Sequence, residues 1–279
     1  MEYKIIIDSC GELTSEMKAS GIYTSIPLYI TVGERNMVDD ETFDQQEFLR
    51  AAAATKECPR SSCPSPDQYL ESYRGNEKRV YGVTLSANLS GSYNSAMLAK
   101  TMMEEQEPDK QVYIFDSRSA SVAQTLIGLK IRECEEKGLS FEEVVTEVEA
   151  YIEGQNTYFV LEDLETLRKN GRLTGLKMLV ASALNIKPVC GATAEGTIFQ
   201  LGQGRGINKA LQKMVQYLTT EVINPTEKVL AISHCNCLER AESVKKMILE
   251  KVAVKEVIIL DTRGISTMYA SDGGIIAVV

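Results

Sequence analysis

The chain has 279 residues, of which 44% are hydrophobic and 25% are charged, and this composition can bury a sizeable core in each of two domains. Its formal charge of −9 is divided unevenly, because residues 1–157 carry 15 Lys and Arg against 27 Asp and Glu, whereas residues 158–279 carry 15 against 12. The acidic first part disfavours general binding to nucleic acid. An anionic ligand or an acidic partner would suit the second part, and ordinary surface composition explains its charge more simply.

The sequence also bears on the cellular compartment. No segment approaches the ~18 apolar residues of a membrane span, and the N-terminal residues pass directly into a strand-like run without a basic leader. Seven cysteines without regular spacing are typical of reduced thiols. We therefore expect a cytoplasmic protein without stable membrane insertion.

Short apolar runs alternate with amphipathic stretches, which is typical of an α/β protein with mainly parallel sheets. In chain order the pattern predicts strands at 4–7 and 25–32, a helix at 43–54, a strand at 79–85, a helix at 92–105, a strand at 112–115, helices at 119–137 and 141–153, strands at 158–161 and 186–190, a helix at 207–220, a strand at 228–232, a helix at 238–252, and strands at 257–260 and 274–279. The polar residues 153–156 are the predicted junction between an N-terminal domain, 1–157, and a C-terminal domain, 158–279.

Three loops rich in Ser and Gly lie where strands pass towards helices: residues 8–11, 60–65 and 86–92. Ligands of parallel α/β sheets bind at the carboxyl ends of the strands. The third loop also opens a helix, whose free N–H groups favour an anion. For each loop by itself, a helix cap or a turn is the simpler interpretation.

Several kinds of chemistry find no support in the sequence. It contains neither a GxxxxGK[ST] phosphate loop nor a GxSxG elbow, and the glycines of residues 202–206 lack the spacing of a dinucleotide fingerprint. The one histidine, His234, precedes Cys235 and Cys237, but neighbours this close on one strand rarely complete a metal site, so a structural role is favoured. No cofactor is expected.

Taken in order, the motifs resemble the DegV family, one group of which is known as bacterial fatty-acid-binding proteins, over nearly the whole chain. The first four are similar to the family's DSTADL, VPL, TSQPS and LSGTY, and they stand at residues 8–13, 26–28, 61–65 and 89–93. The other four are similar to its DS, GGR[IL], NIKP and R…KAL, and they stand at 116–117, 170–173, 185–188 and 205–211. Each motif is weak alone, whereas eight in the family's order are specific.

The resemblance implies a DegV-like α/β fold with two domains, in which the C-terminal domain is a sheet with helices. It implies an acyl chain in an apolar tunnel and a carboxylate held by Ser-rich loops. It further implies a carrier rather than an enzyme, one that presents its fatty acid to a separate kinase for acyl-phosphate formation. The donors that it predicts are Ser61, Ser62, Ser90, Ser92, Tyr269 and the backbone around Gly91, with Arg172 and Arg205 at the mouth or at a partner. The apolar residues 176–184 suit a tunnel wall and a plain core equally.

The sequence departs from the family near its end, where the family commonly has HxGPGA. Tyr269 stands in place of the histidine and Asp272 in place of the proline. A phenol can donate to a carboxylate but cannot supply a positive charge to an acyl phosphate. Fatty-acid binding is therefore favoured over a part in phosphotransfer.

Two alternatives stay open. One is a binding-only protein that sequesters or senses a lipid without a kinase, which Tyr269 and Asp272 favour. The other is a hydrolase or transferase acting on a small anion, which would need His234, Asp8 or Asp116 as its base.

Overall fold

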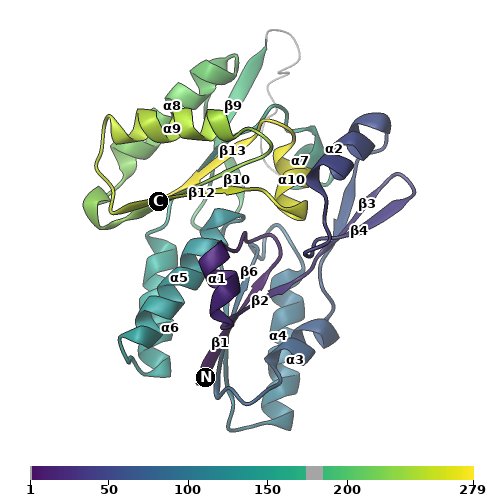
Figure 1. Cartoon of the computed structure of the whole chain (residues 1–279), viewed down its shortest axis with the longest axis vertical. Coiled ribbons are helices and arrows are strands. Elements are labelled where there is room, and N and C mark those ends of the chain that lie inside the picture. Colours follow the sequence, from purple (N-terminus) through teal and green to yellow (C-terminus); the bar gives the residue numbers. More distant parts are fainter. Residues whose placement is uncertain (1, 174–184) are drawn as a thin grey trace.

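The computed structural model describes residues 2–173 and 185–279, and these form three sheets with their helices. The two larger sheets are stacked along the long axis, the first below and the second above (Figure 1). Among the described residues, no helix has the length and apolar character to cross a lipid bilayer. The predicted α/β fold class is confirmed, while the domain boundary at residue 157 stays a prediction.

The first sheet is parallel throughout and buried on both faces. Its strands have the order β2 (Tyr23–Ile26), β1 (Tyr3–Asp8), β6 (Arg79–Thr84) and β7 (Gln111–Asp116). Because successive strand residues point to opposite faces, Ile5 and Ile7 pack towards α5 (Val122–Glu136) and α6 (Phe141–Glu153), whereas Ile6 packs towards α3 (Pro66–Tyr73) and α4 (Ser92–Gln106). Burial on both faces explains the continuous apolar run of β1. The short helix α1 (Ser15–Ser20) packs beside β2.

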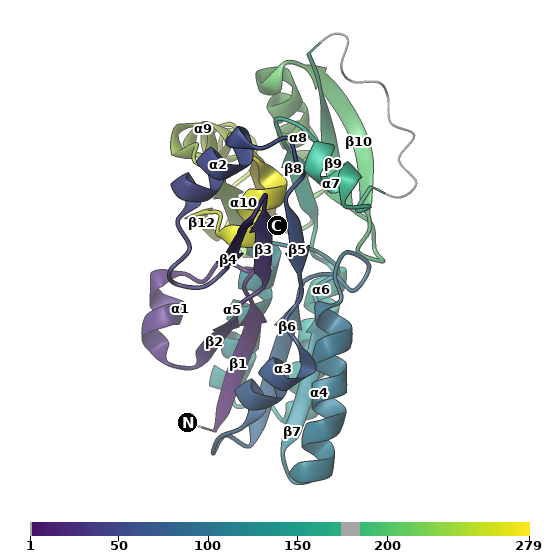
Figure 2. The ribbon, with the colours of Figure 1, turned by 90° about the vertical axis from the view of Figure 1, so that its right-hand side faces the viewer.

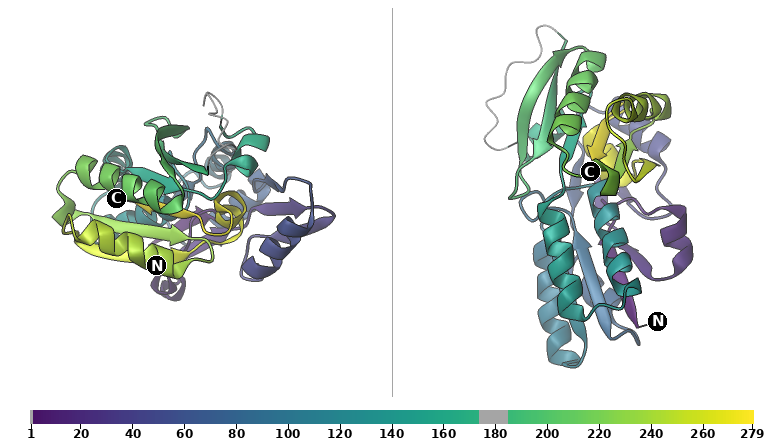
Figure 3. Two further views of the ribbon diagram at one scale, coloured as in Figure 1. Left: turned by 90° about the horizontal axis from the view of Figure 1, so that it is seen from above. Right: turned by 90° about the vertical axis from the view of Figure 1, so that its left-hand side faces the viewer.

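The second sheet has six strands and is mostly antiparallel, so the expectation of mainly parallel sheets is wrong for this half. Only β11 (Val229–His234) and β12 (Glu256–Asp261) pair in parallel. The strands β9 (Ile186–Ala192) and β10 (Ile198–Arg205) form a hairpin, whose short connection requires antiparallel pairing. The central strands β8 (Thr157–Val160) and β13 (Ile275–Val278) are antiparallel to both neighbours. Helices α8 (Ile207–Glu221) and α9 (Leu238–Leu249) cover one face (Figure 3).

A small antiparallel sheet rises from the first half beside the second. It contains β4 (Arg35–Val38), β3 (Tyr29–Val32) and β5 (Arg60–Ser62) in this order, and α2 (Gln45–Ala54) packs on it. The predicted strand 25–32 is therefore wrong as one element, because Pro27 interrupts it and its two parts join different sheets. Ile30 and Phe48 of this unit pack with Ile265 of α10 (Gly264–Ala270), as Figure 2 shows for the ribbons.

The remaining predicted helices and strands are confirmed, with ends shifted by up to three residues. Asp44 accepts a hydrogen bond from Glu47 N at 2.8 Å and so begins α2 two residues after the predicted start. The pattern missed one long strand, β10, and the shorter elements α1, β4, β5, α3, α7 (Glu165–Lys169), the 3-10 turn Pro225–Glu227 and α10.

Candidate functional site

A slender apolar cavity lies between the two halves of the molecule. It encloses about 740 Å³ of space between its wall atoms, the part open to solvent included. Its wall comes from the loops after β1, β6 and β7, from β8, β13, α7 and α10, and from the β9–β10 hairpin. The lining residues are Cys10, Leu85, Leu89, Ser119, Ala120, Ser121, Thr157, Phe159, Leu161, Leu167, Arg172, Ala192, Gly196, Thr197, Ile198, Ile265, Ser266, Tyr269, Ala270 and Ile276.

The alternation of β8 gives the cavity its floor. Thr157, Phe159 and Leu161 line the cavity, whereas Tyr158 and Val160 belong to the core beneath α8. Since a strand rises ~3.3 Å per residue, the floor from residue 157 to residue 161 is roughly 13 Å long. The predicted wall at residues 176–184 lies outside the described residues.

The hydroxyl groups of the wall are engaged with other protein atoms and leave mostly carbon atoms facing the cavity. Ser119 Oγ lies 2.7 Å from Thr157 Oγ1, and Ser266 Oγ donates to the carbonyl of Cys10 at 2.9 Å. Almost no polar surface is exposed to the cavity. A small polar metabolite would therefore lose its hydrogen bonds to water without replacing them, whereas an alkyl chain fits both the shape and the polarity.

Polar donors gather around one part of the wall, which we call the mouth group: Ser61, Arg172 and Tyr269. The phenol oxygen of Tyr269 lies 3.2 Å from Ser61 Oγ. Arg172 Nε donates to the carbonyl of Leu89 at 3.1 Å, and another guanidinium nitrogen donates to the carbonyl of Asn170. Burial raises the pKa of Tyr269, against the opposing effects of the Ser61 hydroxyl and the Arg172 charge. The phenol is thus a neutral donor at physiological pH.

The second and third predicted Ser-rich loops, residues 60–65 and 86–92, lie next to each other, but their hydroxyl groups have different partners. A Cβ on the exposed Gly91 would lie 3.1 Å from Cys63 Sγ, so the loops touch. Ser62 is exposed, and Ser90 Oγ lies 3.0 Å from Ser92 Oγ and accepts from Ser92 N at 3.2 Å. Ser92 itself is fully buried, on the side of Asp8.

Arg205 lies apart from these residues. It is exposed at the end of β10, and the described part of the cavity wall does not include it.

Two buried carboxyl groups lie behind the wall, and sequence reasoning missed the role of the second. Asp8 accepts from Leu85 N at 2.7 Å and Gln124 Nε2 at 2.9 Å, and burial raises its pKa to about 6 against these donors. Glu12 accepts from Ser121 Oγ at 2.8 Å, and burial raises its pKa to about 7. We call Asp8, Glu12, Ser92 and Ser121 the inner group, because it joins β1, β6, α4 and α5; of its four members only Ser121 also lines the described cavity.

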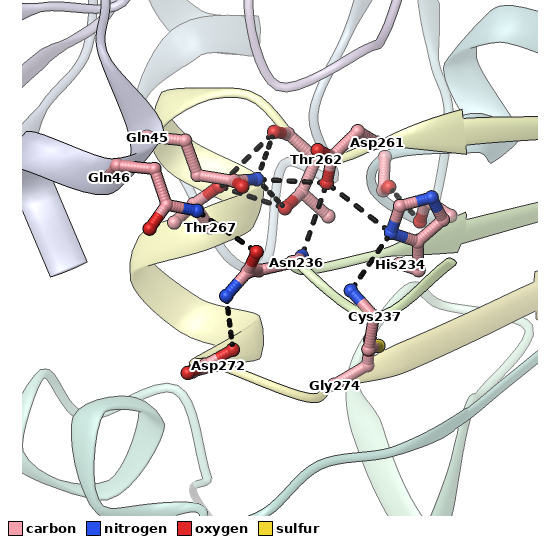
Figure 4. A network of polar contacts seen from close by, with 12 residues as sticks. Gln45, Gln46, His234, Asn236, Cys237, Asp261, Thr262, Thr267, Asp272 and Gly274 are labelled. Atoms are coloured by element: carbon pink, nitrogen blue, oxygen red, sulfur yellow. Dashed lines mark hydrogen bonds and ion pairs between the residues drawn. The ribbon is translucent and has the colours of Figure 1, made fainter. Parts of the chain in front are cut away.

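None of the three candidate bases faces the cavity in the described structure. Asp8 is buried and engaged as above. Asp116 Oδ1 accepts from the backbone N–H groups of Ala87 at 3.1 Å and Arg118 at 3.0 Å. His234 Nδ1 accepts from Cys237 N at 3.3 Å and lies 3.4 Å from Asp261 Oδ1, while burial lowers the pKa of the imidazole and Asp261 opposes that effect (Figure 4).

The hydrogen bonds around His234 and Asp261 continue to α2 and to Asp272, and they show the direction of the Asp272 side chain. Gln45 Nε2 donates to Asp261 Oδ1 at 2.9 Å, and Gln46 Nε2 donates to Asn236 Oδ1 at 2.9 Å (Figure 4). Asn236 Nδ2 in turn donates to Asp272 Oδ1 at 3.0 Å, and Asp272 is exposed. The carboxylate that replaces the family's proline therefore faces the surface and not the cavity.

Comparison with known proteins identifies the relatives of this chain. A family model described as "Uncharacterised protein, DegV family" matches residues 2–279. A DegV domain-containing protein of Streptococcus pneumoniae strain R6 is 36% identical over 278 residues, which cover 99% of this chain and 98% of the relative. The resemblance inferred from the eight motifs is thereby confirmed.

Two solved structures share the fold over their whole length. A DegV family protein of Ruminococcus gnavus with vaccenic acid is 55% identical, with a TM-score of 0.98 and coverage of 100% of this chain and 99% of that one. The Fatty Acid Kinase (Fak) B3 protein of Streptococcus pneumoniae, loaded with linoleic acid, is 34% identical, with a TM-score of 0.89 and the same coverage.

Proposed function

Because this chain belongs to the DegV family, we propose that it is a carrier that binds one long-chain fatty acid. The observation that carries the proposal is the slender apolar cavity beside a group of hydroxyl and guanidinium donors. The acyl chain lies along the floor of the cavity, and the carboxylate lies beside the mouth group. The solved relatives with vaccenic and linoleic acid support this assignment.

The energetics suit tight binding of the chain and selection for an acid at its head. Burial of a C16–C18 tail at ~0.8 kcal/mol per CH₂ gives about 12 kcal/mol before the costs of association and ordering. A carboxylate buried without partners would cancel much of this gain. Ser61, Tyr269 and Arg172 supply donors, and hydrogen bonds to an ionised acceptor are the stronger kind.

Of the other predicted donors, those in the adjoining loops remain part of the proposal, whereas Ser92 and Arg205 receive other roles. Ser62, Ser90 and the backbone of Gly91 lie next to the mouth group and are proposed as further contacts of the carboxylate. Ser92 is used inside the protein, towards Asp8. Arg205, exposed on β10, is proposed for contact with a partner rather than with the lipid.

Presentation of the bound acid to a fatty-acid kinase is the second part of the proposal, and the relative named Fatty Acid Kinase B3 protein supports it. A binding-only role is the alternative, which one observation favours. Tyr269 is a neutral donor whose pKa is raised by burial, so it cannot supply the positive charge that an acyl phosphate would attract.

The test of lipid binding uses delipidated protein and palmitate. We expect Ser61→Ala combined with Tyr269→Phe to weaken palmitate binding at least about tenfold, since each lost donor to a charged group costs ~1.5–3 kcal/mol. Ser20→Ala, on α1, is the control, because α1 contributes no described residue to the cavity. An unchanged dissociation constant for palmitate in the double variant would contradict the proposal that the carboxylate binds beside Ser61 and Tyr269.

The kinase is tested separately. Transfer of labelled phosphate to the loaded protein, dependent on a kinase of this family, is compared between the wild type and Tyr269→His. Improved transfer by Tyr269→His supports the binding-only alternative for the wild type. Efficient transfer by the wild type, with no gain from the histidine, supports presentation to a kinase.

A further inference from the structure

The helix α10 determines the shape of much of the cavity. Four of its seven residues line the cavity: Ile265, Ser266, Tyr269 and Ala270. Tyr269 also supplies the phenol of the mouth group. A small rotation of this helix would therefore turn the phenol of Tyr269 away from Ser61.

The start of α10 depends on an acceptor from the other half of the chain. The first N–H groups of a helix have no partner within the helix, and Arg263 at the N-cap position carries only donors in its side chain. Asp39, the residue after β4, supplies the acceptors. Its Oδ1 accepts from Gly264 N at 2.7 Å and its Oδ2 from Ile265 N at 2.9 Å, across 225 and 226 residues of sequence.

Asp39 is itself held tightly and approaches the helix closely. It is 1% exposed, and Ser9 Oγ donates to its Oδ2 at 2.9 Å. A Cβ at position 264 would lie 2.5–2.8 Å from atoms of the Asp39 side chain, so only glycine permits this approach. Next to it, Arg263 contacts Glu41 Oε1 at 3.1 Å and donates to the carbonyl of Asp40.

The other end of α10 contacts the same small sheet. Tyr269 meets Ser61 of β5, and β4 and β5 are the two edges of the sheet β4-β3-β5. We propose that Asp39 is a positioning residue for the fatty-acid site: it fixes the N-terminal end of α10 so that Tyr269 stands beside Ser61. This inference rests on the proposed function and names a residue that does not line the described cavity.

The test compares two head groups on the same chain length. Palmitate and hexadecanol affinities are measured for the wild type, for Asp39→Asn and for the control Asp40→Asn, whose carboxylate accepts hydrogen bonds from the backbone and hydroxyl of Thr42. We expect Asp39→Asn to weaken palmitate binding about tenfold and hexadecanol binding far less. In a Tyr269→Phe background, Asp39→Asn should leave the palmitate affinity almost unchanged, since the donor that Asp39 positions is already absent.

Gly264→Ala is the second variant, because it keeps the charge of Asp39 and displaces the helix. It should reproduce the selective loss of palmitate affinity, and it decides the question if Asp39→Asn does not fold. Two results would overturn the inference: unchanged preference for palmitate in both variants, or equal losses for palmitate and hexadecanol that persist beside Tyr269→Phe. Failure of the wild type to bind palmitate at all would instead refute the proposed function.

Discussion

The inner group and the mouth group lie on different sides of the same cavity wall and are built from similar residues. In the inner group, Asp8 and Ser92 are fully buried and are satisfied by protein atoms. In the mouth group, Ser61 and Tyr269 are half-buried and contact each other beside the charge of Arg172. The difference teaches that a Ser-rich loop after a strand can serve either to hold neighbouring strands and helices together or, as proposed for the mouth group, to meet a ligand. Burial and existing partners decide between the two.

Changes in the inner group should therefore cost stability, whereas changes in the mouth group should cost binding. The largest effect is expected for Asp8→Ala. It would leave three buried donors without an acceptor, from Leu85, Cys10 and Gln124, and each such loss costs ~1–3 kcal/mol. We expect the free energy of unfolding to fall by about 4 kcal/mol, measured by urea denaturation at pH 7.5.

Asp109→Ala, at an exposed position, is the control and should leave the free energy of unfolding nearly unchanged. A loss below about 1 kcal/mol for Asp8→Ala would mean that the buried donors find other partners, and the inner group would lose its structural role.

Glu12 gives the inner group a dependence on pH. Burial raises the pKa of Glu12 from 4.5 to about 7, so between these values the folded protein keeps a proton that the unfolded chain releases. The stabilising effect of this proton is full below pH 4.5 and is lost as the pH rises to about 7. The wild type should thus lose about 3 kcal/mol over this window relative to Glu12→Gln. Parallel stability curves for the two proteins would show that Glu12 does not titrate there.

The smallest expected effects concern Ser61 and Ser92, which the sequence predicts to have the same role. Ser92→Ala should lower the free energy of unfolding by about 1 kcal/mol and leave palmitate affinity unchanged. Ser61→Ala should leave the stability unchanged and weaken palmitate binding several-fold. Both variants are measured by thermal unfolding and by palmitate titration. A loss of palmitate affinity in Ser92→Ala together with a loss of stability alone in Ser61→Ala would show that the two loops have the opposite roles.

Most of the fold could be predicted because its larger elements have long periodic patterns or apolar runs, as in β1 and α6. The short elements could not, since their stability comes from distant partners. The N-terminal acceptor of α10 is Asp39, which no local pattern connects to Gly264. The strand β10 was missed for another reason, because glycines weaken the sequence pattern of a strand. A Cβ at Gly204 would overlap the backbone of Ala210, so glycine is needed there for the close contact with α8.

For the candidate site, the sequence predicted residue types that the structure brings together, but not how each side chain is used. The family resemblance pointed to Ser61 and Tyr269, which lie 208 residues apart and meet in the structure. The full burial of Ser92 and the outward position of Asp272 depend on tertiary packing and on the bond to Asn236. A sequence motif specifies the residue types of a loop but not which of its side chains are already occupied.

The central claim is that the cavity holds one fatty acid, and native mass spectrometry of the protein purified from a heterologous host tests it most directly. The spectra are recorded before delipidation, after delipidation, and after addition of palmitate or oleate. We predict one bound C14–C18 acid per chain, lost on delipidation and regained on addition of either acid. The absence of stoichiometric lipid in the purified protein, together with no uptake of added palmitate or oleate, would contradict the claim.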